Sequence, residues 1–303
     1  MPATFRRPGS GHLDTTTYTF EETCGAGSGG GCSDSSGAQG RTEPMNASGN
    51  TLTVPTIELL GMRLARVTRP ELEDTVVRSL REGRGGWIIT ANVDHLLRHT
   101  SNAEVAALNE QADLVVADGM PLLWAARLQA TPLPGRVAGS DLVWTLAECA
   151  ARNDFSLFLL GGAPGAATGA AKRFCERWPA LRIAGTASPI VSDVPTPEQL
   201  NDLRGELQRA KPDLVYVALG APKQERVIAA LRPALPGAWW IGVGIGLGFV
   251  AGNPKRAPLW MQSLGLEWFH RLLQEPRRLM RRYFLEDLPF TFRLLVHAWR
   301  VRR

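Results

Sequence analysis

From about residue 56 onward, short apolar runs alternate along the chain with longer stretches in which apolar residues recur every three or four positions. Short apolar runs are typical of strands buried on both faces, and the longer stretches are typical of amphipathic helices. The alternation therefore predicts an α/β fold whose mostly parallel sheet is flanked by helices. The expected strands are residues 87–91, 114–117, 155–160, 183–186, 214–219 and 239–243.

Several expected helices begin at side chains that can cap them. Thr68 and Thr196 each stand three residues before a Glu or Gln and directly before a residue pair containing Pro, which predicts capping boxes. Ser101 with Glu104 predicts another helix start. Polar or glycine-rich segments follow the expected strands, and open parallel sheets bind ligands at that carboxyl edge. We therefore expect a Rossmann-like sheet with its site at this edge.

Composition divides the chain into three regions. In residues 1–50, 23 residues are Gly, Ser or Thr, which predicts a disordered low-complexity tail. Residues 51–252 carry the alternating pattern of the α/β core. Residues 253–303 form an Arg-rich and aromatic-rich appendage, and nine Arg against four acidic residues in 265–303 account for the net charge of +5. This composition predicts a helical segment that lies on an anionic membrane surface.

No apolar stretch in the sequence is long enough for a membrane-spanning helix. Residues 238–252 come nearest, but they are too few and contain five glycines, so we expect a buried strand that runs into a tight loop. Membrane contact is therefore expected to be peripheral. The tail lacks the apolar stretch of a secretory signal, and the four cysteines form no paired motif, so we expect a cytoplasmic protein at the inner face of the cell membrane.

The segment after the first core strand carries polar groups. Thr90 and Asn92 place a hydroxyl and an amide just past a buried strand, where they can contact a polar ligand. The alternative is that Asn92 only caps the next helix. His95 and His99 have a spacing compatible with a metal site, but no Glu or Cys partner has matching spacing. We expect solvated or capping histidines and no metal.

Asp118 follows four apolar residues and precedes Gly119. A carboxylate held there stands at the edge of the sheet with room for a ligand, which makes Asp118 the best candidate for a catalytic base. The alternative is that Asp118 is the N-cap of a helix that begins near Pro121.

Three glycine-rich loops carry the other candidate binding residues. Arg136 lies among small residues before a helix start and can recognise phosphate or carboxylate. Gly161 and Gly162 begin a strand-to-helix turn whose backbone N–H groups can cradle a phosphate or a ribose. Lys223 and Gln224 begin a helix, where the helix dipole favours an anionic or sugar ligand. The alternative for Arg136 is a surface loop arginine, and the alternative for Lys223 and Gln224 is a first helical turn with solvated polar residues.

Some nucleotide motifs are missing from the sequence. Neither the loop at 161–165 nor the glycines at 242–248 satisfy the P-loop or GxGxxG patterns, which disfavours a dinucleotide dehydrogenase or epimerase. No DxD triplet is present to hold a divalent metal against a nucleotide diphosphate. If a diphosphate leaves here, Arg and Lys must neutralise it, and no cofactor is expected.

Taken in order, these residues resemble the WecG/TagA/CpsF family of bacterial glycosyltransferases over about 57–285. The matching motifs are residues 90–92 (TAN), 117–121 (ADGMP), 136–141 (RVAGSD), 160–162 (LGG), 220–225 (GAPKQE), and 255–258 (KRAP) with 265–268 (GLEW). Members transfer N-acetylmannosamine, its uronic acid or a related hexose from UDP onto a polyprenyl-diphosphate-linked sugar in cell-surface polymer synthesis.

The resemblance implies an inverting, metal-independent displacement in which Asp118 takes the proton of the acceptor hydroxyl. It places Thr90, Asn92, Arg136 and Gln224 in the donor and acceptor pocket. It also implies that appendage arginines close over the site and offset the charge of UDP, namely Arg271, Arg278 and Arg281. The appendage would contact the membrane, with homo-oligomers as the resting form and no nucleic acid as a partner.

Two features depart from the family pattern. Many members carry an Asp after the last strand where this chain has Gly248, and Leu247 replaces an aromatic residue. The tail and the extension beyond about 285 have no counterpart. A different class of protein also fits part of the composition: a non-catalytic nucleic-acid or phosphate-binding protein, because aromatic side chains clustered with Arg can stack bases. Acceptor-dependent release of UDP distinguishes the two.

Overall fold

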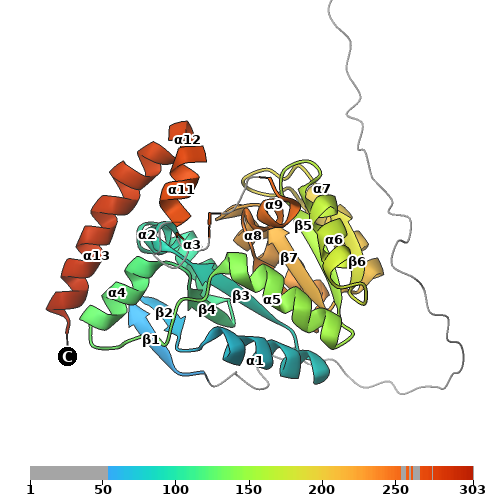
Figure 1. Ribbon diagram of the computed structural model, residues 1–303, viewed down its shortest axis with the longest axis horizontal. Helices are drawn as coiled ribbons and strands as arrows, with labels where there is room; N and C mark the ends of the chain where they lie inside the picture. Colours follow the sequence, from blue (N-terminus) through green and yellow to red (C-terminus); the bar gives the residue numbers. More distant parts are fainter. Residues whose placement is uncertain (1–53, 254–256, 259–260, 262–266, 275, 303) are drawn as a thin grey trace, which may run out of the picture.

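The computed structural model describes residues 54–253, 257–258, 261, 267–274 and 276–302, without the side chains of Arg271 and Arg278. Figure 1 shows a core of sheet and helices with a helical arm along one side. The expected disordered tail at 1–50 lies outside the described residues, as do Lys255 and Arg256.

A parallel sheet of six strands, in the order β4-β3-β8-β7-β5-β6, forms the centre of the molecule. This confirms the expected α/β fold with a mostly parallel sheet. All six predicted strands are present, with ends shifted by at most one residue. Their bounds are β3 (Gly86–Ala91), β4 (Leu114–Ala117), β5 (Ser156–Gly161), β6 (Arg182–Ala187), β7 (Leu214–Ala218) and β8 (Trp239–Gly242).

Side chains alternate between the two faces of this sheet and form two cores. Along β3, Trp87 and Ile89 belong to one core, and Ile88 between them belongs to the other. One core packs under α2 (Val93–Ser101), α4 (Met120–Leu128), α7 (Pro197–Ala210) and α8 (Lys223–Leu231). The other packs under α1 (Arg69–Arg81), α5 (Gly139–Arg152), α6 (Ala166–Arg177) and α9 (Gly246–Ala251). Both faces are covered, as a parallel sheet requires.

Smaller elements complete the core. Strands β1 (Thr56–Leu59) and β2 (Met62–Ala65) form an antiparallel hairpin whose turn includes Gly61 at φ +85°. Helix α3 (Ala103–Glu110) packs against α2 and α8, and a short 3-10 helix, η1 (Arg232–Ala234), follows α8. The sequence pattern did not predict the hairpin, although Ile57 and Leu59 alternate with exposed neighbours as a half-buried strand does.

Two predicted capping boxes are confirmed and one predicted helix start is wrong. Thr68 and Thr196 cap α1 and α7 through their side chains, and the residue at the third helical position reaches back in each case. The start expected at Ser101 is instead at Asn102, whose side chain accepts from the N–H groups of Glu104 and Val105. Ser101 ends α2 and donates its hydroxyl to Leu97 O at 2.8 Å.

A second correction concerns the glycine-rich segment after β8, where we expected a tight loop. Residues 246–251 form the helix α9 instead, and Leu247 and Val250 are buried in the core. Gly246 approaches Val143 closely, since a Cβ built on Gly246 would lie 2.9 Å from that side chain. The glycines therefore allow a buried helix to pack closely, at a cost in helix propensity that burial offsets.

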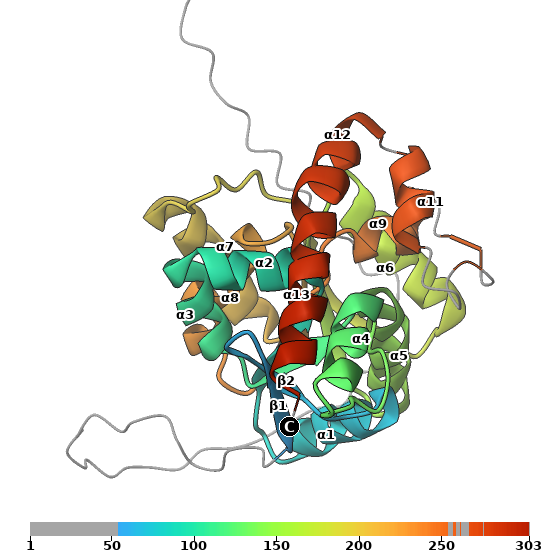
Figure 2. The same cartoon turned by 90° about the vertical axis from the view of Figure 1, so that its left-hand side faces the viewer.

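The C-terminal region is helical, as expected. It comprises α11 (Glu267–Gln274), α12 (Pro276–Arg281), the π-helical segment η2 (Arg282–Asp287) and α13 (Leu288–Arg300). Helix α13 packs against α4 by burying Phe290, Leu294 and Ala298, and Figure 2 shows it crossing the front of the core. No helix within the described ranges is long and apolar enough to cross a membrane.

Candidate active site

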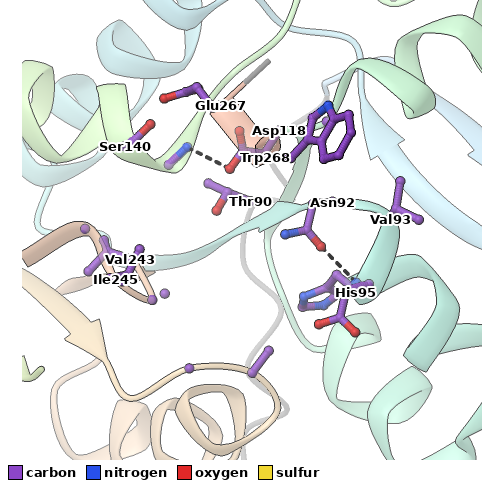
Figure 3. A pocket seen from close by; sticks show the side chains of 18 of the residues that line it. Thr90, Asn92, Val93, His95, Asp118, Ser140, Val243, Ile245, Glu267 and Trp268 are labelled. Atoms are coloured by element: carbon purple, nitrogen blue, oxygen red, sulfur yellow. Dashed lines mark hydrogen bonds between the residues drawn. The ribbon is translucent and has the colours of Figure 1, made fainter. Parts of the chain in front are cut away.

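A cleft of about 1270 Å³ lies at the carboxyl edge of the sheet, where the sequence predicts the site. Its walls come from the ends of β3, β4, β7 and β8, from the turn after β5, and from the appendage (Figure 3). The predicted residues Thr90, Asn92, Asp118, Arg136, Gly162, Lys223 and Gln224 all line it. The cleft thus brings together motifs that are up to 134 residues apart in the sequence.

Asp118 lies in the cleft directly after β4. Its N–H donates to Ala91 O at 2.8 Å, which continues the pairing of β3 and β4 and fixes the residue. Its carboxylate accepts a hydrogen bond from the N–H of Gly139, the first residue of α5, at 3.2 Å. It does not cap α4, whose N-cap is Gly119 with no side-chain capping bond. The structure therefore rules out the alternative structural role considered for this residue.

The pKa of Asp118 is raised to about 6. Loss of solvent around the half-buried carboxyl is the main cause, and the carboxylates of Glu267 and Asp141 add to it. The Arg136 guanidinium and the hydrogen bond from Gly139 act in the opposite direction. A carboxyl with this pKa is ionised at neutral pH and is a stronger base than an ordinary aspartate, as general base catalysis requires.

Thr90 and Asn92 lie beside Asp118 at the end of β3. A Cβ built on Gly139 would lie 2.8 Å from Thr90 Oγ1, so glycine allows the start of α5 to approach both Thr90 and Asp118. Asn92 caps α2 by accepting from the N–H of His95 at 3.0 Å, and it also lines the cleft. The two interpretations of Asn92 are therefore compatible, because its side-chain oxygen caps the helix while the residue also lines the cleft.

Arg136 joins the core to the appendage. Its Nη1 donates to Glu267 Oε2 at 2.8 Å, and both side chains are about 80% buried, with exposed fractions of 20% and 19%. Because the guanidinium also lowers the pKa of Asp118, its charge acts on the carboxylate expected to react. Arg136 therefore binds the appendage through Glu267 and also affects the charge of Asp118.

The turn after β5 contributes one of its two predicted glycines to the cleft. Gly162 lines the cleft with φ +88°, and α6 begins four residues later. Gly161, at φ +93°, is not among the lining residues; a Cβ built on it would lie 2.8 Å from Leu219 and 2.9 Å from Ala218 O. The absence of a side chain at Gly161 thus allows β5 to approach the end of β7 closely, and Gly161 is not part of the cleft surface.

Lys223 and Gln224 begin α8, and their side chains are already engaged. Lys223 Nζ donates to Val191 O at 2.8 Å and lies 3.3 Å from Asp193, so it ties down the loop between β6 and α7. Gln224 is buried; its Oε1 accepts from the N–H of Gly244 at 3.1 Å. Both residues therefore shape the cleft by fixing neighbouring loops.

The two histidines of α2 are bridged by an asparagine. His95 Nε2 lies 2.8 Å from Asn109 Oδ1, and Asn109 Nδ2 lies 3.2 Å from His99 Nδ1. His95 is buried, which corrects the expectation of a solvated side chain. Within the described part of the chain, no three His, Cys, Asp or Glu side chains form a group that could hold a metal. The absence of a metal requirement stays a prediction.

The appendage contributes residues that the sequence motifs did not indicate. Arg282 lines the cleft, whereas the neighbouring Arg281 is exposed and does not. Arg271 lies in α11 and Arg278 in α12, but their side chains are outside the described set. Trp124 of α4, which no motif indicated, also lines the cleft, as does Trp268, the last residue of the motif at 265–268. The sequence does not distinguish Arg282 from the nine other appendage arginines, so only its position in the fold could single it out.

A basic carboxylate beside an arginine, in a large cleft at the carboxyl edge of a parallel sheet, is the arrangement of a group-transfer enzyme. The family model described as "Glycosyl transferase WecG/TagA/CpsF family" matches residues 57–303. The chain belongs to this family and is a glycosyltransferase, which confirms the resemblance and extends it through the appendage.

Two curated relatives are similar over most of the core. A protein of Bacillus spizizenii is 31% identical over 202 residues, which is 67% of this chain and 76% of the relative. A protein of Bacillus subtilis (strain 168) is 32% identical over 197 residues, or 65% of this chain and 75% of the relative. Both are named N-acetylglucosaminyldiphosphoundecaprenol N-acetyl-beta-D-mannosaminyltransferase.

Proposed function

We propose that the protein transfers a sugar from a UDP-sugar to a polyprenyl-diphosphate-linked sugar, with inversion at the anomeric carbon and without a metal. The observation that carries the proposal is the position of Asp118: its carboxyl lies in the cleft, accepts a hydrogen bond from the N–H of Gly139 and has a pKa of about 6. The names of the two Bacillus relatives supply the acceptor class.

In this reaction Asp118 accepts the proton of the acceptor hydroxyl as its oxygen attacks the anomeric carbon of the donor. The new glycosidic bond forms on the face opposite UDP, the bond to the UDP oxygen breaks, and UDP leaves with the electron pair. One displacement inverts the anomeric configuration. Asp118 then releases its proton to solvent, which a group with a pKa of about 6 does readily at neutral pH.

Fixed positive groups would offset the charge of the departing UDP. Gly162 and Ala163 line the cleft ahead of α6, and Arg136 and Lys223 bring cations to it. Donors held in place by the fold, as Arg136 is by Glu267, stabilise developing charge with little rearrangement during the reaction. These residues perform the role that a metal has in other UDP-sugar enzymes, and we propose no cofactor.

N-acetylmannosamine is the donor sugar that we propose first, because both relatives are named for it. Gly248, where many members of the family carry an Asp, lines the cleft. The difference from those members therefore lies on the wall that a donor would contact, and a uronic acid or related hexose is tested beside N-acetylmannosamine.

We also propose that α13 and η2 rest on an anionic membrane at the cytoplasmic face. Large apolar side chains form a stripe on the side of this segment opposite its buried residues. The stripe consists of Leu285, Leu288, Phe292 and Trp299, all at least 59% exposed. Arg293 and Arg300 flank it and are also exposed. An apolar stripe flanked by arginines favours the interface of an anionic bilayer.

The experiment that tests the reaction measures UDP release by the full-length protein, with UDP-sugars and a short-chain polyprenyl-diphosphate-N-acetylglucosamine acceptor. We expect turnover that requires the acceptor, and we expect Asp118→Asn to lose it by a factor of about 10² to 10⁴. Asp202→Asn, at an exposed residue of α7, is the matched control and should retain activity.

Acceptor-dependent turnover that survives Asp118→Asn would remove Asp118 from the role of base. Protein that releases no UDP with any donor, and instead binds DNA or RNA in a salt-dependent way, would support the nucleic-acid-binding alternative. Chromatography of the same samples with and without detergent reports whether the resting form is a homo-oligomer.

A further inference from the structure

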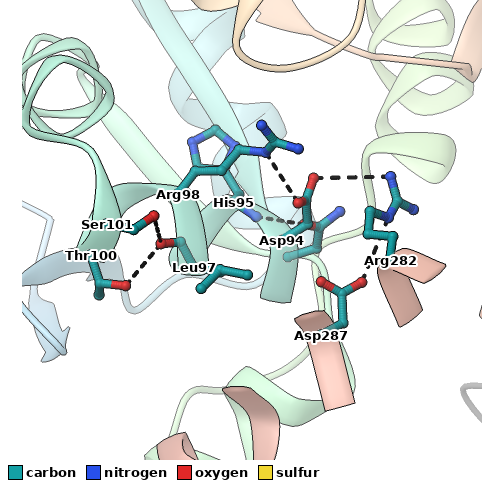
Figure 4. A network of polar contacts seen from close by, with 9 residues as sticks. Asp94, His95, Leu97, Arg98, Thr100, Ser101, Arg282 and Asp287 are labelled. Carbon is teal, nitrogen blue, oxygen red and sulfur yellow. Dashed lines mark hydrogen bonds and ion pairs between the residues drawn. The ribbon is translucent and has the colours of Figure 1, made fainter. Parts of the chain in front are cut away.

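Four charged side chains form a cluster on one wall of the cleft. Asp94 and Arg98 come from α2, and Arg282 and Asp287 come from the two ends of η2 (Figure 4). Arg98 Nε donates to Asp94 Oδ1 at 3.1 Å. All four residues line the cleft, so the cluster faces the same space as Asp118.

The hydrogen-bonding groups of the cluster are only partly paired with one another. Arg282 lies 4.0 Å from Asp94 and 3.7 Å from Asp287, beyond the distance of a good hydrogen bond in both cases. Its Nε and the Oδ1 of Asp287 are buried without a hydrogen-bond partner. Burial, with the nearby carboxylate of Asp94, raises the pKa of Asp287 to about 6. Ion pairs this long add little to stability, so attachment of the appendage alone does not explain the cluster.

The surroundings of the cluster are those of a binding site. Trp268, Tyr283 and Phe284 line the cleft on the same appendage, and the Trp268 and Tyr283 rings lie 6.0 Å apart, edge to face. The cluster is connected to Asp118 through the pairing of β3 with β4. Asp118 is hydrogen-bonded to Ala91, three residues before Asp94. A ligand held by the cluster is therefore on the same side of the sheet edge as Asp118.

The chemistry of the cluster fits a neutral sugar better than a phosphate. Two carboxylates and two guanidinium groups cancel in charge, and the carboxylates repel a diphosphate. A sugar hydroxyl can donate to a carboxylate and accept from a guanidinium at once, which satisfies the groups that lack partners. Aromatic side chains supply flat apolar surfaces for the faces of a sugar ring.

We propose that Asp94, Arg282 and Asp287 form the subsite for the sugar of the lipid-linked acceptor. This inference rests on the proposed function. The appendage side of the cleft includes Leu288, which also belongs to the stripe proposed to lie on the membrane, from which the acceptor arrives. Gly162 and α8 leave the other side to the nucleotide. The subsite would hold the sugar whose hydroxyl Asp118 deprotonates.

The test compares two probes bound to the full-length protein in detergent: a short-chain polyprenyl diphosphate with N-acetylglucosamine, and the same lipid diphosphate without the sugar. We expect the wild type to bind the first probe at least about 10-fold more tightly, because the sugar's hydroxyls satisfy buried polar groups. Arg282→Gln and Asp287→Asn should each bring this ratio close to one. Affinity for UDP should stay within about twofold.

Two control variants separate recognition of the sugar from attachment of the appendage. Arg277→Gln changes an exposed arginine of α12, and Leu294→Ala loosens the packing of α13 against the core without touching the cluster. Both should preserve the ratio. If Leu294→Ala abolishes the ratio as Arg282→Gln does, the cluster acts through attachment and the subsite is wrong.

Failure of the subsite and failure of the proposed function give different results. Normal acceptor-dependent UDP release, with an unchanged ratio of affinities in Arg282→Gln and Asp287→Asn, overturns the subsite alone. Wild-type protein that binds neither probe and releases no UDP overturns the proposed function, and the subsite with it.

Discussion

Arg136 and Glu267, 131 positions apart in the chain, form an ion pair of 2.8 Å across the boundary between the core and the appendage. The two charges have opposite effects on Asp118: the Arg136 guanidinium lowers the pKa of its carboxyl, and the Glu267 carboxylate raises it. Docking of the appendage therefore adjusts the basicity of a residue that belongs to the core.

Glu267→Gln is expected to move the pH profile of turnover to lower pH. Activity should rise as Asp118 loses its proton, with a midpoint near its pKa of about 6. Without the Glu267 charge, one cause of the raised pKa is removed and Arg136 is free to approach Asp118, so the midpoint falls. Profiles of kcat/KM against pH check this. Glu110→Gln, at an exposed residue of α3, should leave the midpoint in place.

Gly139→Ala is expected to lower kcat by about 10- to 100-fold with little loss of stability. The new methyl group would lie 2.8 Å from Thr90 Oγ1 and would displace the backbone N–H that donates a hydrogen bond to the Asp118 carboxylate. A small misplacement of reacting groups has an effect of this size. Gly135→Ala is the matched control, because a Cβ there meets no atom within 4 Å. Equal activity of both variants would show that the close approach at Gly139 has no role in the reaction.

Lys223→Gln is expected to raise KM for the UDP-sugar about 10-fold, while Asp193→Asn leaves it within about twofold. Lys223 is held 3.3 Å from Asp193, whose side chain is 94% exposed. An exposed ion pair contributes little, so the ammonium group can turn from Asp193 to a phosphate at small cost. Steady-state kinetics in the donor measure both values. Equal increases in KM would mean that Lys223 acts by holding its loop in place.

Asp118→Asn is expected to make the fold more stable at neutral pH. The folded-state pKa, about 6, is above the value near 3.9 of an unfolded aspartate, so stability falls as pH rises from about 4 to about 6. Asparagine avoids this loss and should add at most about 3 kcal/mol to the free energy of unfolding at pH 7.5. Urea titrations at pH 4 and 7.5 check that the gain appears only at the higher pH. A variant that is less stable at pH 7.5 would contradict this account of the carboxyl.

Phe292→Ser and Trp299→Ser are expected to weaken binding to anionic vesicles, together by at least about 10-fold. Each change removes a large exposed side chain from the apolar stripe, 69% and 64% exposed respectively, and leaves the buried face of α13 intact. Vesicle co-sedimentation measures the effect. Val194→Ser, at an apolar residue that is also 69% exposed but lies in the loop before α7, should bind as the wild type does. Unchanged binding by the α13 variants would move the membrane contact elsewhere.

The sequence was sufficient to predict the sheet and several residues that line the cleft, because both depend on local patterns. Buried strands are continuous apolar runs, and the polar residues that follow them meet at one edge once the strands are parallel. Asp118 and Thr90 were predicted in this way. The start of α3 was misplaced by one residue because Ser101 and Asn102 can both cap, and only the packing of α2 decides between them.

The site residues of the appendage were less predictable, because the sequence does not distinguish one of its arginines from another. Arg281 and Arg282 are neighbours, yet one faces solvent and the other the cleft, and that difference depends on the π-helical turn of η2 and its docking on α2. Gly161 and Gly162 are also neighbours with different roles. One glycine permits contact between two strands and the other faces the cleft, and the sequence contains no signal that separates them.

The chain passes from Asp118 into α4 within two residues, and α13 packs on α4. One rigid unit thus connects the carboxylate to the helix that we propose to rest on the bilayer. Such a unit would fix the distance between the Asp118 carboxylate and the membrane surface, on the order of the 10 to 20 Å taken by one or two packed helices. At a fixed height, a sugar next to the lipid carrier is within reach and a sugar further out is not. The enzyme would then add one sugar and no more, because the hydroxyl of a longer saccharide would lie out of reach of Asp118. It would not need to recognise the end of a growing chain.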